Sequence, residues 1–423
     1  MSTKKKYHPD SNTVNVVNSR TQQERCYSVT KKMLHHLGLE PEMIDVFTKK
    51  QRLDLLTVWF EAPIVKPKKE KTVPRHYVRN IHANMHTFMK TKFWGNIENQ
   101  LTYMDAAIYG MSFLLNLSNM YEQGRLIPDS IQEQTAKQIY EKRSKESVLD
   151  DIFENVLYEV WFCTRCFSKV NFRMYGYEFK LENSKRANGL CLKVTVLLTA
   201  QDSESKKFTH NGISRRAFRV LHTADGRYEN KSFIRRNLIF ADAKENETLN
   251  IYIQSHVLHR LKERLDTYGP ALHNLTVLYA FTNGVQIVSA GRQKLFSCLT
   301  SDAVPIGYFT FFVQGSDIVI NTFLPLLSPD TPEGKKFHEL LPLSNDDMNY
   351  LGMDKTSFLL TIDFEQIPVL KQALVEAGVW ATKLKLDSLS NDGIDDITKT
   401  SIDMNRTIFV KKFFEKLSTE TVL

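Results

Sequence analysis

The sequence contains few of the features that would identify a secreted, membrane-spanning or disulfide-rich protein. Only 5 of its 423 residues are cysteine, too few for a disulfide framework in a chain of this length. The longest apolar runs, residues 110–117 and 194–200, are far shorter than a membrane-spanning helix. No apolar segment follows the lysines of the N-terminus, so we expect no secretory signal. These absences predict a cytoplasmic protein with no membrane partner.

The sequence also lacks the short motifs of several large enzyme classes. It contains no GxxxxGK[ST] loop, no GxGxxG, no HExxH and no GxSxG. Their absence argues against a nucleotide-dependent enzyme, a zinc protease and an α/β-hydrolase, and we expect no cofactor.

Two sets of residues suggest a metal or redox role, and their surroundings argue against it. His82 and His86 are spaced i, i+4 on one helical face, but no third ligand follows at a suitable spacing. Cys163 and Cys166 form a CxxC near the end of an expected helix, with no second pair of Cys or His to complete a zinc site. We therefore predict packing or surface histidines, buried or semi-buried thiols, and no metal site.

The charge balance favours a polyanionic partner. The chain carries 56 Lys and Arg against 48 Asp and Glu, a net charge of +8, and its pI is about 9.0. Such an excess suits RNA or DNA, although the acidic residues make the surface a mixed one. The hydrophobic content of 42% and the mean hydropathy of −0.32 are typical of a globular protein.

The spacing of apolar residues divides the chain into three parts. Residues 1–24 are polar and aperiodic, which predicts a mobile tail. Residues 25–170 repeat at three- and four-residue steps and predict an all-helical region, interrupted by a linker or exposed basic loop at 62–74. Residues 171–423 predict a region that mixes helices with one substantial antiparallel sheet, so the expected fold class is α+β.

Turn residues in the second half predict three hairpins. Asp225-Gly226 and Asn283-Gly284 each lie between apolar runs, as two-residue hairpin turns do. A third turn falls between Gln314 and Asp317. Residues 357–378 predict a strand followed by a helix.

The strongest chemical pattern lies in the segment that begins at Leu249 and ends at Asp266. Its first residues alternate like a half-buried strand, and Ser255 is a plausible N-cap for the helix that follows. Val257, Leu258, Leu261 and Leu265 share an apolar stripe, and a second stripe along its edge consists of His256, Arg260 and Arg264. A histidine near its pKa can transfer protons, and arginines can bind a scissile phosphate, so this stripe is the candidate catalytic set.

The order of strand, H-x-x-x-R-x-x-x-R helix and antiparallel strands resembles the small RelE-like and barnase-like ribonuclease toxins of bacteria. The matching residues are Ser255, His256, Arg260 and Arg264, with 317–326 as a late strand. Val257 stands where those families commonly have alanine. The resemblance implies a bacterial or phage-type module that binds or cleaves RNA, or an inactive form of one.

A second group of basic residues flanks the Asp225-Gly226 turn, so that one hairpin could present all of them. They are the candidate nucleic-acid-binding residues Arg215, Arg216, Arg219, Arg235 and Arg236. Phenylalanines accompany them, and arginines for phosphates with aromatics for stacking suit an RNA surface.

Each candidate site also has a structural interpretation. Arg260 and Arg264 can pair with acidic neighbours, His256 can cap or pack at the helix start, and the other arginines can line the solvent face of a sheet. Our leading hypothesis is a protein that engages nucleic acid through its strand-rich half, with ribonuclease activity left open. The alternative is a non-enzymatic interaction or scaffold protein that binds a protein partner through its helical half.

Overall fold

The computed structural model divides the chain into two compact units. Unit 1 comprises Met1–Cys163 and Tyr177–Thr199, and unit 2 comprises Thr164–Gly176 and Ala200–Leu423. The structure describes residues 20–55, 59–69, 72–94, 101–145, 148–186, 189–224, 227–229, 232–244, 246–282, 285–290, 293–299, 304–391 and 400–420. Most of the expected tail, residues 1–19, lies outside these ranges, and the first helix already begins at Arg20.

Unit 1 is largely helical, as the three- and four-residue spacing predicts. The elements from the N-terminus to the end of its sheet are α1 (Arg20–His36), η1 (Pro41–Val46), α2 (Lys49–Asp54), β1 (Trp59–Pro67), α3 (Arg75–Thr91), α4 (Tyr103–Asp105), η3 (Ala106–Gly110), α5 (Met111–Glu122), α6 (Ile131–Lys145), α7 (Val148–Phe167), β2 (Arg173–Arg186) and β3 (Gly189–Asp202). Gly38 ends α1 in the left-handed region at φ +70°, which only glycine adopts without strain.

One strand, β1, lies within this helical region, so the prediction of a loop at 62–74 is wrong for its first residues. β1 pairs in parallel with β3 at the edge of a three-stranded sheet of order β1-β3-β2. Pro63 and Pro67 suggested a loop, but an edge strand tolerates proline because one side needs no ladder hydrogen bonds. The register shifts between Glu61 and Ile64, which places an irregularity at Ala62 and Pro63.

Unit 2 contains the antiparallel sheet that the sequence predicts. Its remaining elements are β4 (Ser205–His210), β5 (Ile213–Arg219), β6 (His222–Ala224), β7 (Arg227–Glu229), β8 (Phe233–Arg235), η4 (Arg236–Leu238), β9 (Thr248–Gln254), α8 (Ser255–Arg264), α9 (Pro270–Thr282), β10 (Ile287–Ala290), β11 (Gln293–Leu299), β12 (Pro305–Gln314), β13 (Asp317–Pro325), α10 (Pro332–Leu340), α11 (Asn345–Leu351), α12 (Thr356–Thr361), η5 (Phe364–Gln366), α13 (Pro368–Glu376), α14 (Trp380–Asn391) and α15 (Met404–Glu420). The sheet has the order β10-β11-β12-β13-β9-β5-β4, and β8 also pairs with β9. Its neighbouring strands run antiparallel except β13 and β9, so the fold class is α+β.

Two of the three predicted hairpins are present. β6 and β7 pair with Ala224 opposite Arg227, although the turn residues between them are outside the described ranges. β12 and β13 pair with Gln314 opposite Asp317.

The third predicted hairpin is wrong, because the segment before Asn283-Gly284 is the helix α9 and not a strand. Nearly all of α9 is buried and most of its residues are apolar, so its sequence shows neither a clear helical nor a clear strand period. The turn residues themselves are not described. The strand expected at the start of 357–378 is likewise the buried helix α12, for the same reason.

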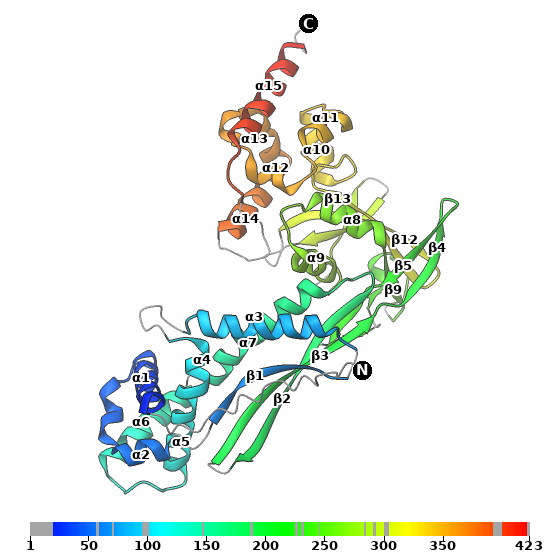
Figure 1. Cartoon of the computed structure of the whole chain (residues 1–423). Helices are drawn as coiled ribbons and strands as arrows, with labels where there is room; N and C mark the ends of the chain where they lie inside the picture. The colour runs from blue at the N-terminus through cyan, green and yellow to red at the C-terminus, as the bar shows by residue number, and fades with distance from the viewer. Residues whose placement is uncertain are drawn as a thin grey trace, which may run out of the picture. The chain divides into compact units, whose positions relative to one another are not determined.

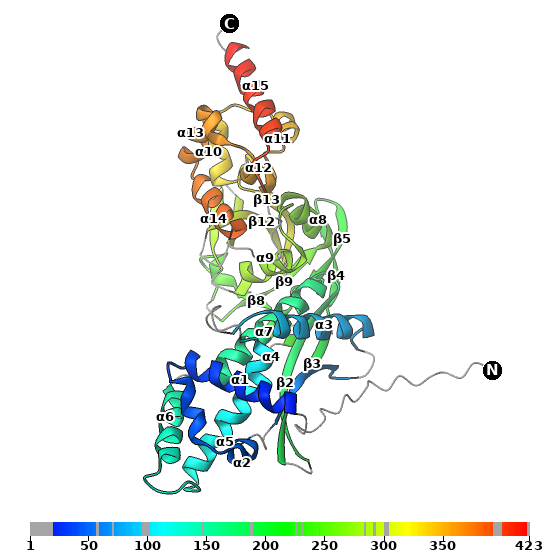
Figure 2. The same ribbon diagram turned by 60° about the vertical axis from the view of Figure 1, so that its left-hand side comes forward.

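The sheet of unit 2 has an extensive apolar core on one face and a small apolar cluster on the other. Alternation along β9 sends Ile251 and Ile253 into the large core, while Tyr252 joins the small cluster. α8 contacts β13, β9 and β5 (Figures 1 and 2) and buries Val257 and Leu261 in the large core. Each such side chain contributes about 1.5–3 kcal/mol when fully buried. α8 is therefore held rigidly against the sheet.

Candidate functional site

Strand β9 passes directly into α8, which fixes the start of the helix relative to the sheet. Gln254 is buried and extended, at φ −78° and ψ 145°, and occupies the N-cap position without a side-chain cap. The predicted N-cap Ser255 is instead the first helical residue. The predicted apolar stripe of α8 is confirmed, since Leu265 is buried with Val257 and Leu261. Burial of this stripe leaves the edge with His256 at the surface.

His256 and Arg260 line an open hollow of about 770 Å³ that also contains two arginines of β5. We call it the cationic hollow; it is lined by Arg215, Arg216, Gln254, Ser255, His256, His259, Arg260, Glu263 and Thr322.

The pairing of β5 with β9 explains why Arg215 lies beside His256. Ala217 is opposite Gln254 in an antiparallel register. Because β5 continues beyond the last paired position, the same register places Arg216 level with Ser255 and Arg215 level with His256. The guanidinium Nη1 of Arg215 lies 3.4 Å from Nδ1 and 3.5 Å from Nε2 of His256, so it rests against the imidazole ring.

The surroundings of His256 favour the neutral form of its imidazole. Burial lowers the pKa of His256, and the positive charges of Arg215 and Arg260 lower it further; a backbone contact with Asn321 acts in the opposite direction. A neutral imidazole next to two guanidiniums can accept a proton while the arginines hold an anion.

The positive charge of the cationic hollow is only partly compensated. The carboxylate of Glu263, the one acid among the lining residues, lies 3.0 Å from both Arg260 Nη1 and His259 Nε2. Arg215 and Arg216 are exposed, and no acidic side chain in the described part of the chain forms an ion pair with either. Lys207 of β4, also exposed, is directly opposite Arg216. Like charges in opposite positions destabilise a strand pair, so this arrangement favours an external anion.

Arg264 does not share this environment. It forms an ion pair with Asp354, and the two side chains retain only 20% and 12% of their exposure. Burial lowers the pKa of Arg264, and the charge of Arg260 adds to the effect. Arg264 lines a neighbouring hollow and not the cationic one. The stripe predicted along α8 is therefore divided between two sites.

The remaining predicted binding residues lie apart from the cationic hollow. The Nη2 of Arg219 donates to Asn250 Oδ1 at 2.6 Å, and its guanidinium covers the ring of Tyr252 in the small apolar cluster. Arg235 is opposite Thr248, and Arg236 lies 3.6 Å from Glu247 and covers Phe240.

The two basic sets are not presented by one hairpin, because β5 and β8 pair with opposite ends of β9. Thr248 and Gln254 bound this strand, and at 3.4 Å per residue they are about 20 Å apart. Arg235 is exposed but isolated from the site.

The residues considered for a metal or redox role, on α3 and α7, have structural surroundings. The rings of His82 and His86 are 4.2 Å apart, and His86 Nε2 lies 2.9 Å from the carbonyl of Pro63. Burial, followed by the charge of His86, lowers the pKa of His82. Cys163 is buried and Cys166 half-buried. Among the described residues no group of three or more metal-binding side chains comes together.

His259 is the functional candidate that sequence reasoning missed. It lies three residues after His256 and four before Glu263, so helical spacing alone would have placed it on the same side.

Comparison with known proteins identified no relative of this chain. None of the described helices is long and apolar enough to cross a membrane. No family model matches the chain, and no curated protein or solved structure is significantly similar to it.

Proposed function

We propose that this protein binds RNA through the cationic hollow of unit 2. The observation that carries the proposal is the pair Arg215 and Arg216, exposed and without an acidic partner in the described chain, beside His256 and Arg260. Uncompensated guanidiniums favour phosphates, which accept two parallel hydrogen bonds from each of them. A rigid helix and a paired strand position these side chains, so little ordering is required on binding.

The chemistry of the lining favours a polyanionic chain over a compact small molecule. The cationic hollow is open, and Lys207 extends its positive charge along the β4–β5 hairpin. Each phosphate contact releases condensed counterions, which makes the affinity high at low salt and strongly dependent on salt.

Binding of a fluorescently labelled single-stranded RNA, followed by anisotropy at low salt, tests the proposal. Replacing both Arg215 and Arg216 by alanine is expected to weaken binding at least tenfold. Arg235→Ala is the matched control, because Arg235 is an exposed arginine of the same unit that lies outside the hollow. Absence of binding to several RNAs, or equal affinity in the double variant, would reject the proposal and favour the protein-interaction alternative.

A second function, cleavage of the bound RNA, is favoured by the two imidazoles, those of His256 and His259, that line the cationic hollow. In this proposal His256 accepts the proton of a 2′-hydroxyl, whose oxygen forms a bond to the adjacent phosphorus. The bond from phosphorus to the 5′ oxygen breaks, and His259, held by Glu263, delivers a proton to the leaving oxygen. The products are a 2′,3′-cyclic phosphate and a 5′-hydroxyl, while Arg260 stabilises the charge on the phosphate.

His256→Ala separates cleavage from binding. We expect this variant to lose RNA degradation by at least a hundredfold while binding falls by less than fivefold. Degradation at an unchanged rate would show that His256 does not act in the reaction.

A further inference from the structure

A second hollow, of about 320 Å³, adjoins the cationic hollow and shares Arg260 and Thr322 with it. We call it the side hollow. Its volume is at the lower end of the range of small-molecule sites. It lies between the end of β13, the end of α8 and the helix α11, all in unit 2.

The side hollow differs in chemistry from its neighbour because it has an apolar floor. Leu324, Pro325 and Pro329 line it, and none of the three is buried. Such a floor cannot bind a phosphate, because a desolvated anion against apolar atoms is unfavourable. It suits a flat apolar face instead.

The rim of the side hollow provides hydrogen-bonding groups in a fixed arrangement. Asn345 and Asn349 are exposed and spaced i, i+4, so they lie on one side of α11. Within the described chain neither carboxamide forms a hydrogen bond, so their donors and acceptors are available. Arg264, which forms an ion pair with Asp354, lies at the same rim.

We propose that the side hollow binds one unstacked nucleobase of the RNA strand whose phosphate occupies the cationic hollow. The proposal rests on the proposed function. Arginine planes and apolar side chains stack on bases, and carboxamides read their edges. Arg260, common to both hollows, lies where the base and its phosphate would meet. Adenine is the expected base, because a carboxamide complements its N6 and N7 in a bidentate manner.

The experiment compares adenylate, uridylate and cytidylate oligomers of equal length with inorganic polyphosphate as a chain without bases. We expect the intact protein to bind the adenylate oligomer about tenfold more tightly than the other two. The variant with both Asn345→Ala and Asn349→Ala is expected to lose this preference and to bind polyphosphate as before. Asn405→Ala, an exposed asparagine of α15 outside both hollows, should change nothing.

The outcomes separate the two proposals. Equal affinity of the intact protein for all three oligomers, or a preference that survives in the double variant, would overturn the base site while leaving RNA binding intact. Failure of every oligomer to bind would overturn both. Because both asparagines are exposed, the variants should keep the melting temperature of the intact protein, and this is checked first.

Discussion

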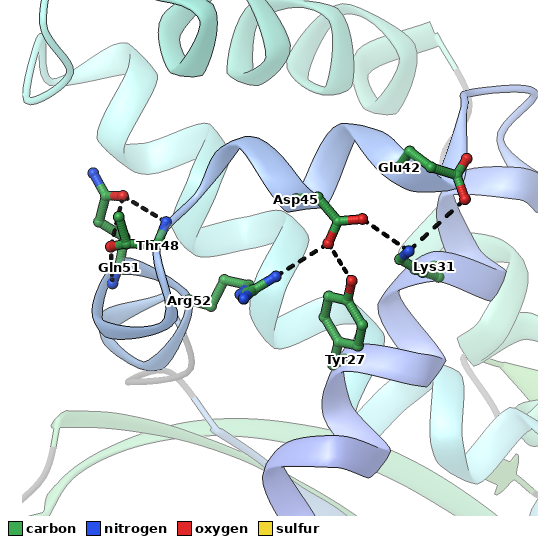
Figure 3. A network of polar contacts seen from close by, with 7 residues as sticks. All are labelled: Tyr27, Lys31, Glu42, Asp45, Thr48, Gln51 and Arg52. Atoms are coloured by element: carbon green, nitrogen blue, oxygen red, sulfur yellow. Dashed lines mark hydrogen bonds and ion pairs between the residues drawn. The ribbon is translucent and has the colours of Figure 1, made fainter.

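Two charged clusters of this protein, one in each unit, show how charge compensation separates structure from function. In unit 1, Asp45 of η1 accepts hydrogen bonds from Tyr27, from Lys31 at 2.9 Å and from Arg52 at 3.2 Å (Figure 3). Glu42 lies 3.8 Å from Lys31 and completes the set. In the cationic hollow of unit 2, one glutamate faces several cations.

The two clusters differ in whether their charged side chains have partners of opposite charge within the protein. Asp45 has a donor on each side, and the hydrogen bond from Tyr27 followed by that from Lys31 lowers the pKa of Asp45. Its partners connect α1, η1 and α2, so the cluster fastens three short elements together. Arg215 and Arg216 form no ion pair with an acidic side chain of the described chain, although Arg215 rests against the imidazole of His256. We therefore interpret the first cluster as structural and the second as a binding surface.

The largest expected effect comes from reversing charge in the cationic hollow. Replacing both Arg215 and Arg216 by glutamate should reduce RNA affinity by about a hundredfold or more, because phosphates then meet carboxylates. Asp45→Ala should leave RNA affinity unchanged. Anisotropy titrations of both variants measure this contrast, and a loss of affinity in Asp45→Ala would abolish the distinction between the clusters.

Arg264 is intermediate between the two clusters. It belongs to the same helix as His256 and Arg260, but it forms an ion pair with Asp354. Arg264→Ala should lower the free energy of unfolding by about 2 kcal/mol, since it leaves Asp354 largely buried and unpaired. The exposed Arg216→Ala should change it by less than about 0.5 kcal/mol. Urea unfolding gives both values. Equal stability of the two variants would mean that the Arg264–Asp354 pair is not structural.

A smaller effect is expected from the cluster in unit 1. Asp45→Asn should lower the free energy of unfolding by about 1 kcal/mol, because surface ion pairs are weak individually but here converge on one carboxylate. Glu42→Gln is the matched control: Glu42 is an exposed acid at the margin of the same cluster, and its removal should have no measurable effect. If the two variants unfold alike, the convergence on Asp45 contributes nothing.

The smallest expected effect is a difference between the two clusters in how folding stability depends on pH. The pKa of His256 is lowered in the folded state, so its neutral form contributes stability above the ordinary histidine pKa of 6.5. That contribution is lost as the pH falls through 6.5 toward the folded pKa. The pKa of Asp45 is also lowered, so its contribution is present above about 3.8 and is lost only at lower pH.

Unfolding measurements at pH 7.5 and 5.5 test these windows. Relative to the intact protein, His256→Gln should gain stability at pH 5.5, whereas the deficit of Asp45→Asn should be the same at both values. The opposite pattern would show that other groups control the titration in this range.

The sequence predicted what depends on local spacing. The apolar stripe of α8, the fold class and the β12–β13 hairpin all follow from periods and turn residues within a few positions. The prolines of β1 predict a loop because proline breaks regular structure locally, whereas the edge of a sheet tolerates it. The largely buried α9 has no clear period in its sequence.

The composition of the site could not be predicted from local spacing. Arg215 meets His256 across 41 residues because β5 and β9 pair in one particular register. Arg264 is withdrawn from the cationic hollow by Asp354, which belongs to a later segment of the chain. Neither the register of β5 and β9 nor the ion-pair partner of Arg264 can be predicted from the spacing of neighbouring residues.

The most direct test of the central claim is the salt dependence of RNA binding. For the intact protein, the logarithm of the association constant should fall linearly with the logarithm of the salt concentration. Replacing both Arg215 and Arg216 by alanine should reduce the magnitude of this slope by about 1.4, since each lost contact with single-stranded RNA accounts for about 0.7. Identical slopes for the two proteins would show that these arginines do not bind phosphate.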